Sequence, residues 1–229
     1  MRTRKPAEQR RSEIIEATLR LADQVGPDRL STAAIASAVG LTQAAIFRHF
    51  PTKQDLWQAV AEQIGQTFQQ RWLAAERTGE SSQRKLRCLV AGQLELIQST
   101  PAIPAILFSR ELHVENDRLR LLFCRMMESF HEIVTSFIAA AQRAGELRPD
   151  LDPRDQAYLV IGLVQGLVLR WSLGGRGFDL VEEGTRLLEA LLGAMTVPGD
   201  RPVSADSRGA STAVPGASGG GPTAAGRRG

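Results

Sequence analysis

Within residues 42–53, several side chains are of types that suit contacts with nucleic-acid bases and phosphates. Gln43 can pair with adenine through two hydrogen bonds, Arg48 can pair with guanine N7 and O6, and Ala44 can meet a thymine methyl group. Arg48 could equally contact a phosphate. Thr42 can donate to a phosphate oxygen, and Lys53 is expected at a helix start, where free backbone amides also favour an anion.

These side chains need a rigid frame, and residues 31–53 predict one. Ser31 and Thr42 can each cap a short helix, because their hydroxyls can accept a hydrogen bond from a free backbone amide. Gly40 lies where the first helix must stop and reverse. The apolar residues of each helix fall on one face, Ile35, Ala36 and Val39 in the first and Ala45, Ile46 and Phe50 in the second. This is the helix-turn-helix pattern, whose second helix can place its N-terminal end in a major groove.

A unit this small needs supporting helices on both sides. Before it, residues 14–25 repeat apolar positions at i, i+3, i+4 and i+7, which predicts an amphipathic helix ended by Gly26. We expect the whole stripe to be core, namely Ile14, Ala17, Thr18, Leu21, Ala22 and Val25. After it, Thr52 and Asp55 form a capping-box pattern that opens a helix reaching about Ala75.

Charge is distributed unevenly along the 229 residues. The net charge is +3, but residues 1–56 carry nine Lys/Arg against six Asp/Glu, whereas residues 57–196 carry fifteen against seventeen. This asymmetry fits a polyanionic partner at one end of the chain. The sequence begins with a basic arm, which could follow phosphates or simply be a solvated terminus; its cations are Arg2, Arg4, Lys5, Arg10 and Arg11.

Residues 11–56 closely resemble the N-terminal domain of the tetracycline-repressor (TetR) family of bacterial regulators. The matching pieces are "IIEATLRLADQVG", "LSTAAIASAVGLTQAAIFRHF" and "PTKQDL". The resemblance implies an all-α fold with a three-helix DNA-binding domain and a helical ligand-binding and dimerisation domain. It further implies a homodimer on double-stranded DNA with a palindromic operator, usually a repressor released by a small molecule.

The resemblance also assigns roles to single residues. The family uses the lysine at position 53 and the histidine at position 49 as phosphate contacts, although His49 could instead be packed at a helix end. Phe47 departs from the family, in which a tyrosine hydroxyl usually reaches a phosphate, so that one contact is in doubt. The expected DNA-contacting residues are Thr32, Thr42, Gln43, Ala44, Phe47, Arg48, His49 and Lys53.

Downstream of the head, the apolar pattern predicts a helical body. We expect three regions, a DNA-binding domain over 1–56, a ligand-binding and dimerisation domain over 57–196, and a disordered tail over 197–229, where Gly, Pro, Ser, Ala and Arg dominate. The chain should contain about nine helices. Those of the body are expected at about 56–75, around 86–97, at 104–113, 116–144, 153–171 and 180–195.

A ligand cavity in the body follows from the resemblance and from methionines and aromatics in the central helix, which adapt to ligands. The candidate lining residues, any of which could also be plain core, are Phe108, His113, Phe123, Met126, Met127, Phe130 and Trp171. Such a cavity would take an apolar small molecule, whether an acyl chain, a drug or an aromatic metabolite.

The dimer interface is assigned by resemblance to the last two helices, 153–173 and 179–195. Glycines inside a helix cost about 1 kcal/mol each relative to alanine, so their presence points to close packing. That packing could join two subunits or lie within one. The candidate interface residues are Gly162, Gly166, Leu187 and Leu191.

Several other classes of protein are disfavoured. No metal-ligand spacing, phosphate loop or nucleophile elbow indicates an enzyme, a metal site or a cofactor. Cys88 and Cys124 lie among apolar residues and read as core or near-surface thiols. The N-terminus lacks an apolar signal segment, and the apolar run 157–169 is too short to span a membrane, so we expect a cytoplasmic protein. A nucleoid-type protein or an activator with the same head stays as the alternative.

Overall fold

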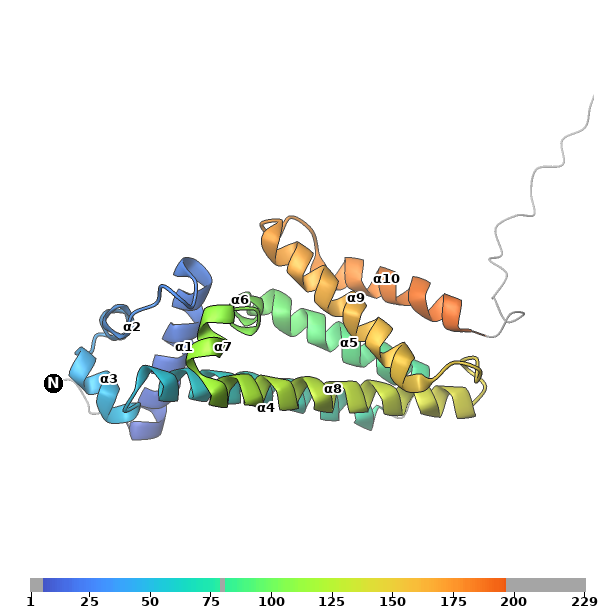
Figure 1. Cartoon of the computed structure of the whole chain (residues 1–229), viewed down its shortest axis with the longest axis horizontal. Coiled ribbons are helices and arrows are strands. Elements are labelled where there is room, and N and C mark those ends of the chain that lie inside the picture. Colours follow the sequence, from blue (N-terminus) through green and yellow to red (C-terminus); the bar gives the residue numbers. More distant parts are fainter. Residues whose placement is uncertain (1–5, 79–80, 197–229) are drawn as a thin grey trace, which may run out of the picture. The chain divides into compact units, whose positions relative to one another are not determined.

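The computed structural model describes residues 6–78 and 81–196, which form ten α-helices and no strand (Figure 1). The all-α fold predicted from the sequence is confirmed. The expected tail, residues 197–229, lies outside the described residues. The helices are α1 (Ala7–Val25), α2 (Thr32–Ala38), α3 (Gln43–His49), α4 (Lys53–Arg77), α5 (Ser82–Ser99), α6 (Ala102–Leu107), α7 (Arg110–Glu115), α8 (Asp117–Arg143), α9 (Pro153–Leu173) and α10 (Leu180–Met195).

The tenth helix arises because the segment expected as one helix over 104–113 is two. α6 ends at Leu107, and α7 begins at Arg110. Between them Ser109 has an extended backbone, and its hydroxyl accepts a hydrogen bond from the amide of Leu112 at 3.1 Å. Ser109 is thus an N-cap inside an apolar stretch, and it turns the chain between two short helices.

Helix α1 corrects two further expectations. It begins at Ala7, so Arg10 and Arg11 belong to the helix and not to an extended arm, and Arg10 pairs with Glu13 at 2.7 Å. The predicted stripe is buried at Ile14, Ala17, Thr18 and Ala22. Val25 is nevertheless 48 % exposed, because the helix ends there and Gly26 turns the chain away with a φ of +84°.

The three helices of the head pack as the helix-turn-helix pattern predicts. α1 lies across α2 and α3, and Ile14, Ile35 and Ile46 are almost fully buried between them. The turn is closed by a hydrogen bond from Leu41 N to Ala36 O at 2.8 Å, and Gly40 has a φ of +64°.

Helix α4 belongs to both the head and the body. Its start carries the predicted capping box: the hydroxyl of Thr52 accepts from the amide of Asp55, and the carboxylate of Asp55 accepts from the amide of Thr52, both at 3.0 Å. Its 25 residues extend about 37 Å at 1.5 Å per residue. The first half buries Leu56 and Trp57 in the head, and the second half packs against α5 and α8.

In the body, α5 packs against α4, α8, α9 and α10 (Figure 1). α8 also packs against α4 and α9, and α9 packs against α10. α10 approaches α5 closely at Gly184, where an added Cβ would lie 2.3 Å from Cδ1 of Leu94 on α5. α9 extends beyond the apolar run 157–169 and is the one helix, among the described residues, long and apolar enough to cross a membrane. It packs on α8 and α10 and buries Val160 and Val164.

Candidate DNA-binding face and ligand cavity

Helix α3 presents one exposed face and one buried face. Ala45, Ile46 and Phe50 are buried against the rest of the head. The exposed residues are spaced at i, i+1, i+4 and i+5, which places them on the opposite face of the helix. They are Gln43, Ala44, Phe47 and Arg48. All three predicted base-reading residues are therefore accessible on the helix that the pattern assigns to the major groove.

The start of α3 is fixed by two hydrogen bonds. The hydroxyl of Thr42 accepts from the amide of Ala45 at 3.2 Å, which caps the helix. The side-chain amide nitrogen Nε2 of Gln43 donates to the hydroxyl of Thr32 at 2.7 Å. Thr32 is only 8 % exposed, so it lies behind the α3 face and orients Gln43.

Positive charge gathers at the C-terminal end of α3. Arg11 donates a hydrogen bond to the backbone oxygen of His49, and its guanidinium lies 4.2 Å from the centre of the Phe50 ring. Partial burial and then the nearby cations of Arg11, Arg10 and Arg48 lower the pKa of His49 below its ordinary value of 6.5. A phosphate placed here would offset the repulsion between these cations and a protonated His49. The site is therefore suited to a phosphate.

Lys53 is the first residue of α4, and its side chain is half-buried beside the free amides of that helix start. The N-terminus of a long helix carries partial positive charge, so amides and ammonium group favour an anion together.

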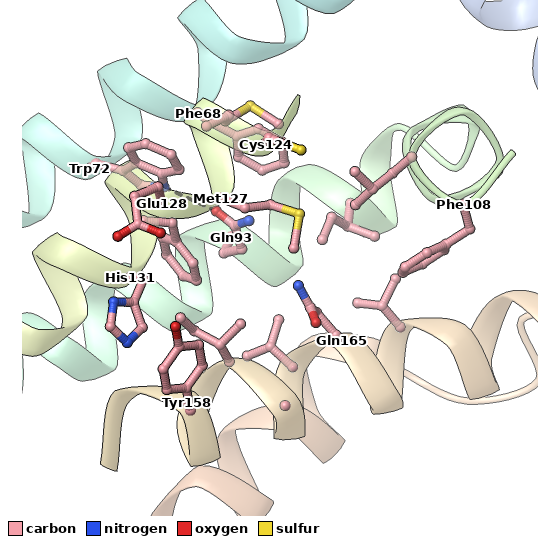
Figure 2. A pocket seen from close by; sticks show the side chains of 18 residues that line it. Phe68, Trp72, Gln93, Phe108, Cys124, Met127, Glu128, His131, Tyr158 and Gln165 are labelled. Carbon is pink, nitrogen blue, oxygen red and sulfur yellow. Dashed lines mark hydrogen bonds between the residues drawn. The ribbon is translucent and has the colours of Figure 1, made fainter. Parts of the chain in front are cut away.

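The body contains a cavity of about 500 Å³ enclosed by α4, α5, α8, α9 and the corner between α6 and α7 (Figure 2). This volume lies in the range of sites that bury drug-sized molecules. The residues that line it are Phe68, Trp72, Gln93, Ile97, Leu107, Phe108, Cys124, Met126, Met127, Glu128, Phe130, His131, Tyr158, Ile161, Gly162, Val164, Gln165 and Val168.

Aromatic rings make up much of the cavity wall. The rings of Trp72 and Phe130 stack at 5.3 Å between centroids, and Phe68 stacks on Trp72 at 6.1 Å. The indole N–H of Trp72 donates to the side-chain oxygen of Gln93 at 3.0 Å, so its only polar atom is satisfied. Figure 2 shows Glu128, His131 and Tyr158 at one end of the cavity and Phe108 at the other.

His131 has a defined hydrogen-bonding role at this polar end. Its side chain is 3 % exposed, and its Nε2 lies 3.2 Å from the backbone oxygen of Arg154. A carbonyl oxygen can only accept, so Nε2 carries a proton and donates this hydrogen bond. Nδ1 is buried and has no partner among the described residues. The ring of Tyr158 lies 4.2 Å from that of His131.

Comparison with known proteins places both parts of the chain. Residues 14–60 match the bacterial regulatory proteins of the tetR family, and residues 82–197 match the C-terminal domain of BetI-type transcriptional repressors. The HTH-type transcriptional regulator TtgR of Pseudomonas putida is 31 % identical over 185 residues, which cover 79 % of this chain and 88 % of TtgR. The chain belongs to the TetR family. It is therefore a DNA-binding transcriptional regulator of a non-enzymatic family.

Other TetR-type proteins match over similar lengths. The nucleoid occlusion factor SlmA of Glaesserella parasuis is 24 % identical over 177 residues, 77 % of this chain and 87 % of that protein. The crystal structure of a putative transcriptional regulator from Saccharomonospora viridis in complex with choline superposes with a TM-score of 0.72 at 23 % identity. That match covers 81 % of this chain and 96 % of that one, and at this identity it shows the shared fold.

Within this TetR fold, four of the seven residues expected at a ligand site line the cavity: Phe108, Met126, Met127 and Phe130. The other three are packed elsewhere. His113 donates from Nε2 to the backbone oxygen of Leu107 at 2.9 Å, and its ring meets Phe123 edge-on at 5.5 Å. Trp171 donates to the backbone oxygen of Phe178 at 3.1 Å. These contacts are those of core side chains.

Sequence reasoning missed the polar end of the cavity. Glu128, His131 and Tyr158 come from α8 and α9, and no short motif connects them. Phe68 and Trp72 were visible as the continuing apolar stripe of α4, although nothing in that stripe distinguishes a cavity wall from filled core. Both cysteines are exposed, and Cys124 lines the cavity mouth, so neither is a core thiol.

The four dimer candidates lie on α9 and α10. Gly162 and Gly166 are exposed, and a Cβ added at either would meet nothing within 4 Å. Close packing within one subunit is therefore wrong as an explanation of these two glycines. Leu187 and Leu191 are partly buried and pack against the core of their own chain.

Proposed function

We propose that the protein is a homodimeric repressor that leaves an inverted-repeat operator when a small molecule enters the cavity. One observation carries this proposal: a single helix, α4, holds Lys53 at the DNA-facing end and Phe68 and Trp72 in the cavity wall. From Lys53 to Trp72 the helix rises about 28 Å. A shift of the cavity wall would move the start of α4 as one body.

The DNA contacts proposed for each subunit combine readout and positioning. Gln43, Ala44 and Arg48 would read base edges in the major groove. Thr42, His49 and Lys53 would hold phosphates on either side. In a two-fold symmetric dimer the two α3 helices would meet half-sites about 34 Å apart, or a multiple of that, so the operator would be an inverted repeat.

The exposed face of α9 supports the proposed dimer. Leu159, Leu169 and Leu173 are 57 %, 42 % and 80 % exposed, and they share this face with Gly162 and Gly166. A row of exposed leucines beside small residues is unusual on the surface of a monomer and is typical of an interface. With α10 alongside, two copies would bury a four-helix contact.

The switch would work by population shift. A ligand changes operator binding only through its different affinities for the two subunit geometries. The cavity is bounded by α4 and by α9. A bound ligand would therefore contact both α4, which extends into the head, and α9, which is proposed to join the subunits. The regulator of this fold from Saccharomonospora viridis was solved in complex with a small molecule, choline.

The first test is fluorescence anisotropy of the purified protein with DNA from its own upstream region and with unrelated DNA, at two salt concentrations. Tight, salt-sensitive binding that prefers the upstream DNA is expected of a local repressor. An absence of binding by the folded protein at low salt would end the proposal.

The dimer is tested by Leu169→Glu, with Val114→Glu as the matched control. Both leave the buried core unchanged, because Leu169 and Val114 are 42 % and 75 % exposed. We expect analytical ultracentrifugation to show that the wild type is a dimer. The dissociation constant of the dimer should rise at least roughly tenfold in Leu169→Glu and stay unchanged in Val114→Glu. Equal dimer stability in all three would move the interface away from α9.

A second function is favoured by one observation, the match to the nucleoid occlusion factor SlmA over 77 % of the chain. A protein of that kind would bind many chromosomal sites, and its body would meet a protein partner. Mapping of bound sites across the genome separates the two, since a local repressor occupies a few promoters.

A further inference from the structure

The charged groups around the cavity narrow the class of ligand. Glu128 is the one acidic side chain among the lining residues, and no lysine or arginine lines the cavity within the described part of the chain. Glu128 is exposed at the mouth of the cavity and forms no ion pair with any described residue. A ligand carboxylate or phosphate bound here would meet this carboxylate without a compensating cation.

The second polar feature at this end also disfavours an anion. Nε2 of His131 is committed to the backbone oxygen of Arg154, and Nδ1 is buried and has no partner among the described residues, so neither ring nitrogen is placed to pair with a ligand anion. The mouth therefore suits a group that carries positive charge, which Glu128 can pair with.

The remaining wall suits an apolar body with a cationic end. Trp72 and Tyr158 lie at the same end of the cavity as Glu128 and His131 (Figure 2). Phe130 stacks on Trp72, and Met126 and Met127 add polarisable sulfur to the lining. Aromatic rings attract cations through their negative faces, most strongly where water is excluded. The apolar remainder, from Ile97 to Val168, provides surface for a hydrocarbon or aromatic portion.

We propose that the cavity binds lipophilic organic cations, with the cationic group at the mouth beside Glu128 and the apolar portion among the aromatic side chains. The effect of such a cation on operator binding rests on the proposed function, whereas its binding to the cavity does not. The two are therefore measured separately on the same full-length protein.

The experiment uses two probes with the same tail and opposite heads, decyltrimethylammonium and decanesulfonate, each far below its micelle concentration. Isothermal titration calorimetry measures their binding to the protein without DNA. We expect the cation to bind at least roughly tenfold more tightly than the anion, because only the cation gains from Glu128 and the ring faces. Equal binding, or tighter binding of the anion, overturns the proposal.

The site is located with Glu128→Gln and a matched control, Glu132→Gln. Glu132 carries the same charge one turn further along α8, is exposed, and does not line the cavity. We expect Glu128→Gln to weaken binding of the cation roughly three- to tenfold and to leave the anion no weaker than before, while the control changes either probe less than about twofold. If the two substitutions had equal effects, binding would depend on the overall charge of the surface. The assignment of the cation site to Glu128 would then be wrong.

Failure of this inference is distinguishable from failure of the proposed function. If neither probe binds, the ligand class is wrong, while anisotropy with upstream DNA still tests the regulator. If the cation binds through Glu128 but leaves operator affinity unchanged, the ligand class stands and release by that ligand is wrong.

Discussion

At the scale of single residues, we predict that His49 gives DNA binding a pH dependence, if it contacts a phosphate as proposed. Burial and the cations of Arg11, Arg10 and Arg48 lower its pKa below 6.5, so the ring is mostly neutral at pH 7.5 in the free protein. A DNA phosphate beside it would raise that pKa, and binding would then take up a proton. Affinity for DNA should therefore rise as the pH falls from 7.5 to 5.5, by roughly three- to tenfold.

The measurement is anisotropy across this pH range at constant ionic strength, with His49→Gln as the comparison. Glutamine keeps a hydrogen-bonding side chain and cannot titrate, so its profile should be flatter than that of the wild type. Identical slopes for the two proteins would remove His49 from the phosphate contacts.

The residues of the head could be predicted because their signals are local. Ser31, Thr42 and Thr52 cap the helices that their positions in the sequence indicate, and Gly40 makes the turn. The link from Gln43 to Thr32 could not be predicted, since it joins two helices across the turn and depends on their crossing geometry. Long-range contacts of this kind have no signature in residue types.

At the scale of elements, the packing of α10 on α5 depends on Gly184. A Cβ there would lie 2.3 Å from Cδ1 of Leu94 and 3.3 Å from Cδ2 of Leu167, and Leu94 is fully buried and cannot move into solvent. Gly184→Ala should destabilise the fold by roughly 1–2 kcal/mol, the strain of overpacking less the helix propensity that alanine gains. Urea unfolding of the two proteins measures this difference.

The same helix provides the control. A Cβ at Gly193 meets nothing within 4 Å, so Gly193→Ala gains helix propensity without strain. It should stabilise the chain, by up to about 1 kcal/mol. If both alanine variants gained stability, α10 would be able to shift on α5, and the close approach at Gly184 would not be a constraint.

Helix boundaries could be predicted wherever a cap or a breaker stands beside an amphipathic stripe. α10 begins and ends at the residues expected, Leu180 and Met195. The division between α6 and α7 was missed because Ser109 interrupts a stretch whose apolar residues fit one helix. The importance of Gly184 was also missed: it is one glycine among several in the last two helices, and only the packed structure shows which of them a neighbour approaches.

At the scale of the whole described molecule, a few polar contacts join head to body. Ser109, which follows the cavity-lining residues Leu107 and Phe108, donates to the carboxylate of Asp28 at 2.5 Å. On the other side, the side-chain Nε2 of Gln54 donates to the backbone oxygen of Glu115 at 2.8 Å. The cavity wall thus continues directly into a contact with the loop between α1 and α2.

Removing the hydrogen bond between Ser109 and Asp28 should weaken the coupling between ligand binding and DNA binding. In Asp28→Ala the caps of α7 and α2 remain, but the α6–α7 corner loses its hydrogen bond to the head, while α6 still packs on α1. We expect decyltrimethylammonium to bind Asp28→Ala as tightly as it binds the wild type, and its effect on operator affinity to fall roughly two- to fivefold. Anisotropy measures operator affinity with and without saturating decyltrimethylammonium, and the ratio of the two affinities gives the size of the effect.

Asp117→Ala is the control for that experiment, because the carboxylate of Asp117 pairs with Arg120 of its own helix and is 83 % exposed. It should leave the ratio unchanged. A ratio that is equally unchanged in Asp28→Ala would mean that α4 carries the coupling without help from the α6–α7 corner.

Apart from the division between α6 and α7, the order of the helices follows from the sequence, because each predicted helix has its own apolar stripe. The cavity could not be predicted from the sequence, because it is the space that the side chains of five segments leave unfilled between them. Phe123 and Phe130 lie two turns apart on α8 and look alike in sequence, yet the first is core and the second lines the cavity. The difference depends on what α4 and α9 place opposite each ring.

The two exposed thiols form a built-in chemical reporter. Cys124 stands at the mouth of the cavity, whereas Cys88 lies on α5 beside Thr185 of α10, away from it. After a maleimide is added to the intact protein, mass spectrometry can therefore measure the alkylation rate of each thiol. The rate at Cys88 serves as the internal reference for the rate at Cys124. Occupation of the cavity should slow labelling of Cys124 several-fold relative to Cys88, whatever the ligand does to DNA. Unknown extracts can thus be searched for molecules that protect one thiol and spare the other.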